Sequence, residues 1–68
     1  MAERQLGNRL KELRTKAGIT QAELAEMVKV SRKTINTVEN GIFVPSTLLA
    51  LSLAKALNTT VERLFFIE

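Results

Sequence analysis

TQAELAEMVKVSRKTINTVENG, residues 20–41, is the stretch of sequence that decides the fold. It opens with Thr20, and Glu23 follows three residues later. At this spacing each side chain can accept an otherwise unpaired backbone N–H at the start of a helix. Apolar residues at helical spacing follow, and we predict that this helix ends near Val28. A brief turn then leads to Ser31, a residue type that favours the start of a second helix.

The helix predicted after Ser31 is almost entirely polar. Only Ile35 and Val38 are apolar, three residues apart, before Gly41 ends the helix. Such a helix can bury one narrow stripe and must expose a wide polar face. Two short helices joined by a tight turn, the second with an exposed polar face, are typical of a helix-turn-helix, whose second helix enters the major groove of DNA.

A further helix is predicted on the N-terminal side of this motif. Its apolar residues recur at helical spacing with charged residues between them, and they are Leu6, Leu10, Leu13 and Ala17. Gly18 can end this helix, because glycine adopts the left-handed conformation without steric cost. The pattern is that of an amphipathic helix with one buried face.

Two more helices are predicted on the C-terminal side. The first, residues 46–57, begins at Ser46 and stops before Asn58, which tolerates a left-handed conformation. The second, residues 60–67, is expected to complete the core and to contribute to dimerisation. The predicted fold class is therefore all-α, a compact bundle of five short helices that forms one domain over residues 1–68.

The composition narrows the classes of function. The chain has a formal net charge of +3 and a sequence pI near 9.8, which is compatible with nucleic acid but common among small soluble domains. It contains no Cys, His, Asp or Tyr, so disulfides, the usual zinc ligands and most catalytic bases and nucleophiles are missing. We expect no cofactor, no metal, no enzymatic activity and no small-molecule effector. The chain lacks a long apolar run and a signal-peptide pattern, so we expect a cytoplasmic protein without a membrane partner.

Several short motifs between residues 10 and 65 carry a resemblance to a known family. They are LKELR at 10–14, GITQAELA at 18–25, VSR at 30–32, VENG at 38–41, PS at 45–46 and LAKAL at 53–57. In this combination the sequence resembles the Cro and phage-repressor type of helix-turn-helix regulator, also called the Xre family, in its short stand-alone form. The resemblance implies a lambda-repressor-like fold and a nucleoid-associated transcriptional regulator that binds double-stranded DNA, with repression as the expected role.

The residues expected to contact DNA bases lie on the predicted recognition helix, and they are Arg32, Lys33, Asn36 and Thr37. Arginine and lysine donate to guanine O6 and N7, and asparagine can pair in two places with adenine N6 and N7. Threonine can bond a base edge or contact a thymine methyl group.

The resemblance also implies phosphate contacts and one structural ion pair. The implied phosphate contacts are those of Gln21 and Asn40, and Gln21 would also help to orient the base-reading residues. Ser31 and the basic side chain of Lys29 are also expected to contact phosphates. Arg14 and Glu39 would form a partly buried ion pair between the first helix and the recognition helix. Lys29 stands where the family usually has glycine, so a left-handed turn there would cost about 1 kcal/mol.

Apolar residues outside the predicted core point to an interface. The loop Ile42-Phe43-Val44 is more apolar than is usual in the family, although we expect Phe43 to plug the core beneath it. Since family members commonly bind DNA as two-fold dimers through their C-terminal helices, we expect a homodimer on a two-fold operator with half-sites about 34 Å apart. The candidate interface residues are Leu48, Phe65, Phe66 and Ile67. The alternative is an antitoxin or a helical protein-interaction module that keeps the same fold.

Overall fold

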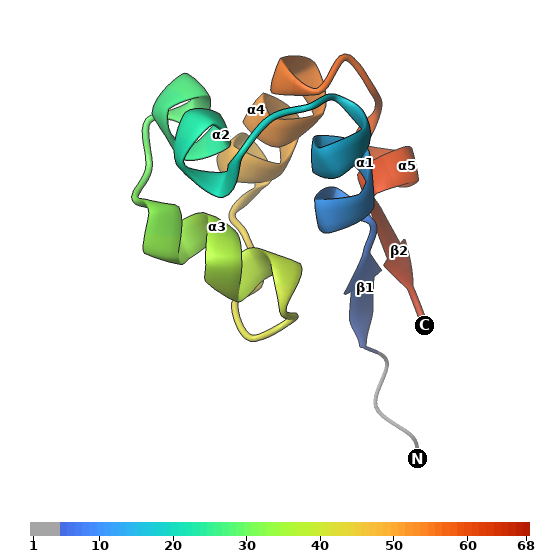
Figure 1. Cartoon of the computed structure of the whole chain (residues 1–68). Coiled ribbons are helices and arrows are strands. Elements are labelled where there is room, and N and C mark those ends of the chain that lie inside the picture. The colour runs from blue at the N-terminus through green and yellow to red at the C-terminus, as the bar shows by residue number, and fades with distance from the viewer. Residues whose placement is uncertain (1–4) are drawn as a thin grey trace.

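The computed structural model describes residues 5–68, so the first four residues of the expected 1–68 domain lie outside it. Within this range the chain forms five helices and two short strands (Figure 1). In chain order they are β1 (Leu6–Asn8), α1 (Leu10–Lys16), α2 (Gln21–Val28), α3 (Arg32–Glu39), α4 (Thr47–Ala56), α5 (Val61–Leu64) and β2 (Phe65–Ile67). The prediction of a mostly helical, five-helix fold is confirmed.

Hydroxyl side chains define where four of these helices begin. Thr20 and Glu23 form the complete capping box of α2, in which each side chain accepts a hydrogen bond from the other residue's backbone N–H. Ser31, Ser46 and Thr60 each accept a hydrogen bond from the backbone N–H three residues further on. The helix starts expected at Thr20, Ser31 and Ser46 are therefore confirmed.

The core is built from one or two positions on each helix and from the first residue of β2. Its buried apolar members are Leu10, Leu24, Ala25, Ile35, Val38, Leu53, Ala54, Leu64 and Phe65. α2 packs against both α3 and α4, and α1 packs against α3 (Figure 1). Ile35 and Val38 are the buried residues of α3, so the predicted narrow stripe is confirmed and the rest of that helix faces outward.

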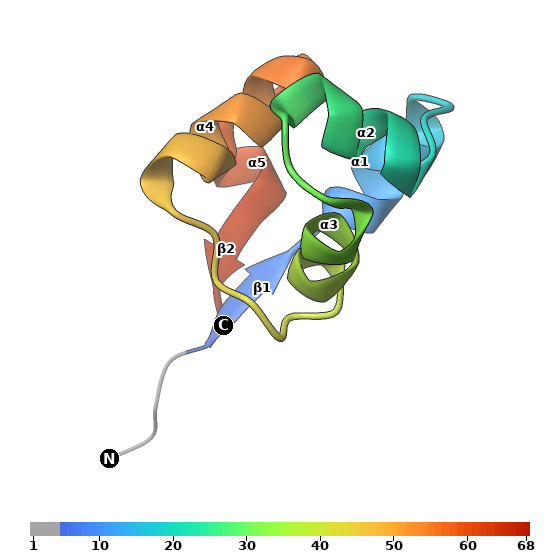
Figure 2. The same cartoon turned by 90° about the vertical axis from the view of Figure 1, so that its left-hand side faces the viewer.

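The prediction of a helix over residues 60–67 is wrong beyond Leu64. Phe65 is already extended, with φ −125° and ψ 144°, and β2 pairs antiparallel with β1 (Figure 2). The run Phe-Phe-Ile favours a strand, and residues 6–8 supply the backbone partners that it needs. Leu6 accordingly lies opposite Ile67 in the sheet and does not belong to the first helix.

Two aromatic residues are placed differently from expectation. Phe65, a candidate for the dimer surface, is only 8% exposed and belongs to the core, because β1 and α5 hold its backbone against the bundle. Phe43, expected to fill the core beneath its loop, is 47% exposed. Its backbone N–H donates to the Thr37 carbonyl, so the loop lies against α3. The apolar loop therefore adds to the surface of the protein.

Gly7 and Phe66 face each other across the two strands. A Cβ atom at Gly7 would lie 2.3 Å from the Phe66 ring, closer than non-bonded atoms can approach. The ring also packs beneath the guanidinium of Arg9, whose Cζ is 5.2 Å from the ring centroid. Glycine at this position therefore lets the ring lie flat on the sheet.

Candidate nucleic-acid interface

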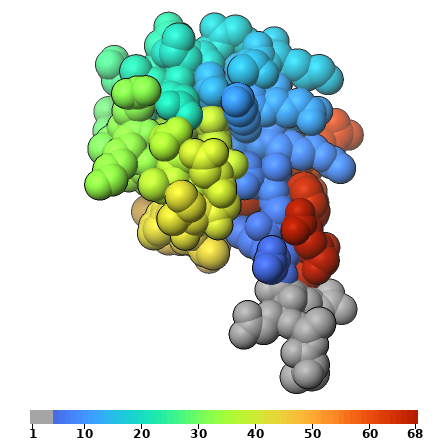
Figure 3. All heavy atoms as spheres, turned by 60° about the horizontal axis from the view of Figure 1, so that its bottom comes forward, coloured from blue at the N-terminus to red at the C-terminus, as the bar shows by residue number. Residues whose placement is uncertain are grey.

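The outward face of α3 is the candidate interface. Lys33, Asn36 and Asn40 are spaced so that they share one side of the helix, opposite Ile35 and Val38. All three are exposed, and a shallow surface recess is lined by Arg32, Lys33 and Asn36. Figure 3 shows α3 and the loop after it at the surface, next to the blue N-terminal part of the described chain, which separates them from the red C-terminal segment. The helix predicted to be polar therefore presents its polar side chains to solvent.

Lys29 closes the turn between α2 and α3 in a left-handed conformation, with φ 62° and ψ 43°. Its backbone N–H and that of Val30 return to carbonyls in the last turn of α2, so the two helices meet at a short, hydrogen-bonded corner. A lysine in this conformation costs about 1 kcal/mol relative to glycine. Lys29 is exposed, and in the surface recesses that it lines its neighbours come from α2 and α4 and include Ile19.

Arg14 and Glu39 form the expected ion pair between α1 and α3. Arg14 Nε donates to Glu39 Oε2 at 2.6 Å, and Nη2 donates to Oε1 at 3.3 Å. The side chains are only 10% and 3% exposed, and the third guanidinium nitrogen donates to the Ile19 carbonyl at 2.8 Å. Glu39 is the acidic residue of α3, and its charge is buried and neutralised. The exposed face of α3 therefore carries positive and neutral groups, which suits a polyanion.

Hydrogen bonds among three side-chain amides, those of Gln21, Asn36 and Asn40, connect this ion pair to the exposed face of α3. Gln21 Nε2 donates to Glu39 Oε1 at 3.0 Å and to Asn36 Oδ1 at 3.2 Å. Asn40 Nδ2 donates to the Asn36 backbone carbonyl at 2.9 Å and to Asn36 Oδ1 at 3.3 Å. Asn36 is thus held from both sides before any ligand arrives.

Hydroxyl groups near the same face are also engaged within the protein. Ser31 Oγ caps Thr34 N and lies 3.0 Å from Thr34 Oγ1, and Thr37 Oγ1 donates to the Thr34 carbonyl at 2.9 Å. In contrast, no hydrogen bond or ion pair joins the charged groups of Lys29, Arg32 and Lys33 to another residue in the range 5–68. These three cations are the groups most available to a partner.

The expected interface residues of the C-terminal part do not form one exposed set. Leu48 on α4 is 76% exposed and Ile67 on β2 is 64% exposed, whereas Phe66 is half-buried. Ile42 and Val44, in the loop after α3, are also exposed, and so is Leu51 on α4, which was not among the expected interface residues.

Asn8 is a residue that sequence reasoning missed. Its Nδ2 donates to the Val38 carbonyl at 3.0 Å, and its Oδ1 accepts the Leu10 N–H at 3.1 Å. The side chain therefore ties β1 to the start of α1 and to the last turn of α3. An asparagine shortly before a helix can accept a backbone N–H at the helix start, but nothing local signals the contact to α3.

No helix of residues 5–68 has the length and apolar character needed to cross a bilayer.

Several known proteins that are similar to this chain in sequence or in structure are regulators or helix-turn-helix proteins by their names. A family model described as helix-turn-helix matches residues 10–64. The uncharacterized HTH-type transcriptional regulator YgzD of Bacillus subtilis is 44% identical over 61 residues, which cover 90% of this chain and 92% of YgzD. The restriction-modification controller protein C.AhdI from Aeromonas hydrophila has a similar structure, with a TM-score of 0.77 and 36% identity over 81% of this chain and 83% of that one. The master regulator for biofilm formation SinR, in complex with DNA, has a TM-score of 0.73 and 26% identity over 78% of this chain and 86% of that one.

Proposed function

Since the chain belongs to the helix-turn-helix family and is a DNA-binding transcriptional regulator rather than an enzyme, we propose that it acts as a repressor that binds a two-fold operator as a homodimer. It works in the cytoplasm, on the DNA of the nucleoid. The observation that supports this most directly is the exposed face of α3, which carries cations and amides, while the carboxylate of α3, Glu39, is buried in its ion pair.

In the proposed complex α3 lies in the major groove and reads base edges with its N-terminal half. Arg32 and Lys33 are fully available as donors to guanine, and Asn36 lies one turn further along the same face. Thr37 contributes its methyl group and hydroxyl oxygen, because its hydroxyl hydrogen is used within α3. These four residues are proposed as the base contacts.

The proposed phosphate contacts are Lys29, Ser31, Gln21 and Asn40. Lys29 offers an ammonium group that no described residue engages, so it is the strongest of the four. The side-chain N–H groups of Gln21 are both in use, so its phosphate contact is assigned to the backbone N–H in the first turn of α2, which has no carbonyl partner within the helix. A contact from Asn40 requires its amide to release Asn36 Oδ1.

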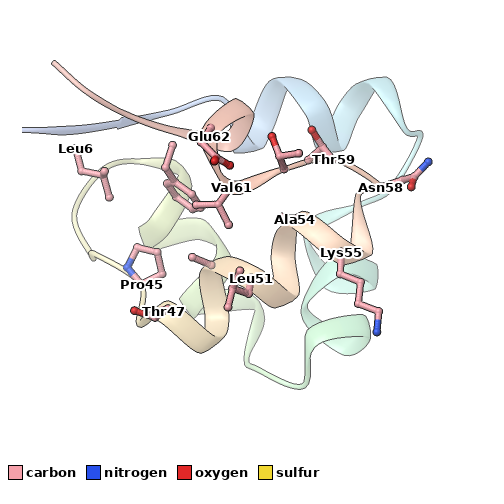
Figure 4. Close-up of a pocket in the computed structure, with 13 residues that line it drawn as sticks. Leu6, Pro45, Thr47, Leu51, Ala54, Lys55, Asn58, Thr59, Val61 and Glu62 are labelled. Carbon is pink, nitrogen blue, oxygen red and sulfur yellow. The ribbon is translucent and has the colours of Figure 1, made fainter.

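The proposed dimer surface lies on the side of α4, α5 and the sheet. An open apolar groove there is lined by residues that include Leu6, Leu51 and Val61 (Figure 4). A surface that pairs with its own copy across a two-fold axis must be complementary to itself. This groove meets the requirement in charge, because it is lined by a cation from α4, Lys55, and a carboxylate from α5, Glu62. The sheet has two strands, so β2 also offers an unpaired edge beside exposed Ile67. We therefore assign the groove to a second copy of the chain.

Selection of duplexes from a random pool at physiological salt tests the proposal. The expected product is a short palindromic motif with half-sites about 34 Å apart, and sedimentation of the selected complex should give two chains per duplex. Selection of no duplex contradicts the binding function, whereas selection of an asymmetric site bound by one chain contradicts only the dimer.

The exposed apolar surface also favours a second candidate, an antitoxin or protein-interaction module. Leu48, Leu51 and Ile67 could contact a different protein in place of a second copy. Salt dependence separates the two functions, because DNA binding weakens steeply as salt rises and an apolar protein interface does not.

A further inference from the structure

We propose that Gln21 and Asn40 lock the Asn36 amide so that it offers only hydrogen-bond donors to DNA, which makes Asn36 select a keto base, guanine or thymine, over adenine or cytosine on the strand that it faces. This inference rests on the proposed binding of α3 in the major groove. It differs from the adenine pairing expected from the sequence, which needs both the oxygen and the nitrogen of the amide.

Two neighbouring amides, Asn40 and Gln21, fix the orientation of the Asn36 side chain, and each is itself oriented by a group that can only accept a hydrogen bond. Asn40 Nδ2 lies 2.9 Å from the Asn36 backbone carbonyl, so the atom of the Asn40 amide on that side must be the nitrogen. The same nitrogen lies 3.3 Å from the Asn36 side chain, which must then present its oxygen.

Gln21 leads to the same orientation through a different partner. Its Nε2 lies 3.0 Å from a carboxylate oxygen of Glu39, which accepts and cannot donate. The same Nε2 lies 3.2 Å from Asn36 Oδ1. Arg14 holds Glu39 in a buried ion pair, so the group that orients Gln21 is itself fixed. The orientation of the Asn36 amide therefore does not depend on solvent-exposed groups alone.

The two donors saturate the Asn36 oxygen and leave its nitrogen for a ligand. A carbonyl oxygen has two lone pairs, and Gln21 and Asn40 each use one. Asn36 Nδ2 has no hydrogen-bond partner among residues 5–68, and the side chain lies in the recess beside Arg32 and Lys33. The free protein therefore presents an N–H₂ group at this point of the α3 face.

An N–H₂ group discriminates among base edges by simple complementarity. Guanine offers the acceptors N7 and O6, and thymine offers O4. Cytosine offers only an amino group, which would face the Asn36 donor with another donor. Adenine offers N7 as one acceptor, but its N6 amino group lies beside N7 and would face the second Asn36 N–H with a donor. Two bonds within the protein must break before Asn36 can pair with adenine in both places.

The experiment compares the base preference of three variants with that of the unchanged protein. Competition binding is measured on the selected site with all four base pairs at each position. Asn36→Ala should flatten the preference at one position, which identifies the base that Asn36 reads. At that position the unchanged protein should prefer guanine or thymine over adenine by about tenfold. Gln21→Ala should reduce that preference severalfold at this position alone. Gln5→Ala makes the same chemical change at an exposed glutamine outside α2 and α3, and it should leave the preference unchanged.

Three results would overturn the inference while leaving DNA binding intact. They are a preference for adenine at the position that Asn36→Ala flattens, no position flattened by Asn36→Ala, and a Gln21→Ala profile that falls equally at every position. The last result would show a merely structural or phosphate role for the Gln21 side chain. Failure of the unchanged protein to bind any duplex would instead reject the proposed function, and this inference with it.

Discussion

Asn8 donates a hydrogen bond from Nδ2 to the backbone carbonyl of Val38 at 3.0 Å, across thirty residues of the chain. The same side chain accepts the Leu10 N–H through Oδ1. One residue of the sheet therefore supports both the start of α1 and the end of the helix proposed to read DNA.

Asn8→Asp separates these two roles. The variant keeps an oxygen for Leu10 N–H but replaces the donor with a carboxylate facing the Val38 carbonyl, so we expect the free energy of unfolding to fall by about 1–2 kcal/mol. Urea denaturation measures the change. Asn8→Ala, which loses both contacts, should cost at least as much, and equal stability of Asn8→Asp and the unchanged protein would show that the bond to Val38 contributes nothing.

Breaking the ion pair of Arg14 and Glu39 should be more costly. Glu39→Gln leaves the buried guanidinium without a counter-charge, which costs about 3–5 kcal/mol, a large share of the stability of a small domain. The double change Arg14→Met and Glu39→Leu removes both charges and should restore much of the loss. Thermal and urea unfolding compare the three proteins. If the double variant is less stable than Glu39→Gln, the pair stabilises the fold by more than its burial costs.

The parts of the structure that the sequence predicts are local. Thr20, Glu23 and Ser31 cap helices because each acts on a backbone group only three residues away. The narrow buried stripe of α3 follows from the helical period of Ile35 and Val38 in the same way.

The parts that sequence reasoning missed depend on contacts between distant residues. Pairing of β1 with β2 joins the two ends of the described chain, and it turns Phe65 inward where a continued helix was expected. The bond from Gln21 to Asn36 spans fifteen residues, and it requires α2 and α3 to cross at the angle set by Lys29. A residue type and its spacing indicate what a side chain can bond, but not which partner the fold brings to it.

Glu23 should give the stability of α2 a pH dependence at acidic pH. Hydrogen bonds from the Thr20 backbone and hydroxyl lower the pKa of the Glu23 carboxyl below its ordinary value. The ionised form therefore stabilises the folded protein at neutral pH, and this contribution is lost as the pH falls through the lowered pKa. Glu23→Gln keeps the capping geometry without titrating, so its stability should fall less than that of the unchanged protein between neutral and strongly acidic pH. Parallel urea titrations at each pH make the comparison, and identical pH profiles would contradict this role.

Lys29 should trade stability for DNA affinity. Lys29→Gly and Lys29→Asn relieve the left-handed strain at φ 62°, and glycine should raise the free energy of unfolding by about 1 kcal/mol. Both variants lose the charge proposed to contact a phosphate, so the slope of log affinity against log salt should become shallower by about 1. Lys29→Arg keeps the charge and should leave both quantities nearly unchanged. A stabilised glycine variant with an unaltered salt slope would mean that Lys29 does not touch the DNA backbone.

Arg32 provides the sharpest test of how α3 is used. Its guanidinium is exposed at the first position of α3 and lines the recess that Asn36 and Lys33 share. If it donates to guanine O6 and N7, Arg32→Ala should weaken binding to the selected site by about 1–3 kcal/mol and relax the preference at one base-pair position. Arg63→Ala removes the same charge from an exposed position on α5 and should leave the preference at every position intact. Equal losses of affinity from the two variants, with the preference at every position kept in both, would indicate a general effect of net charge and would contradict a base contact from Arg32.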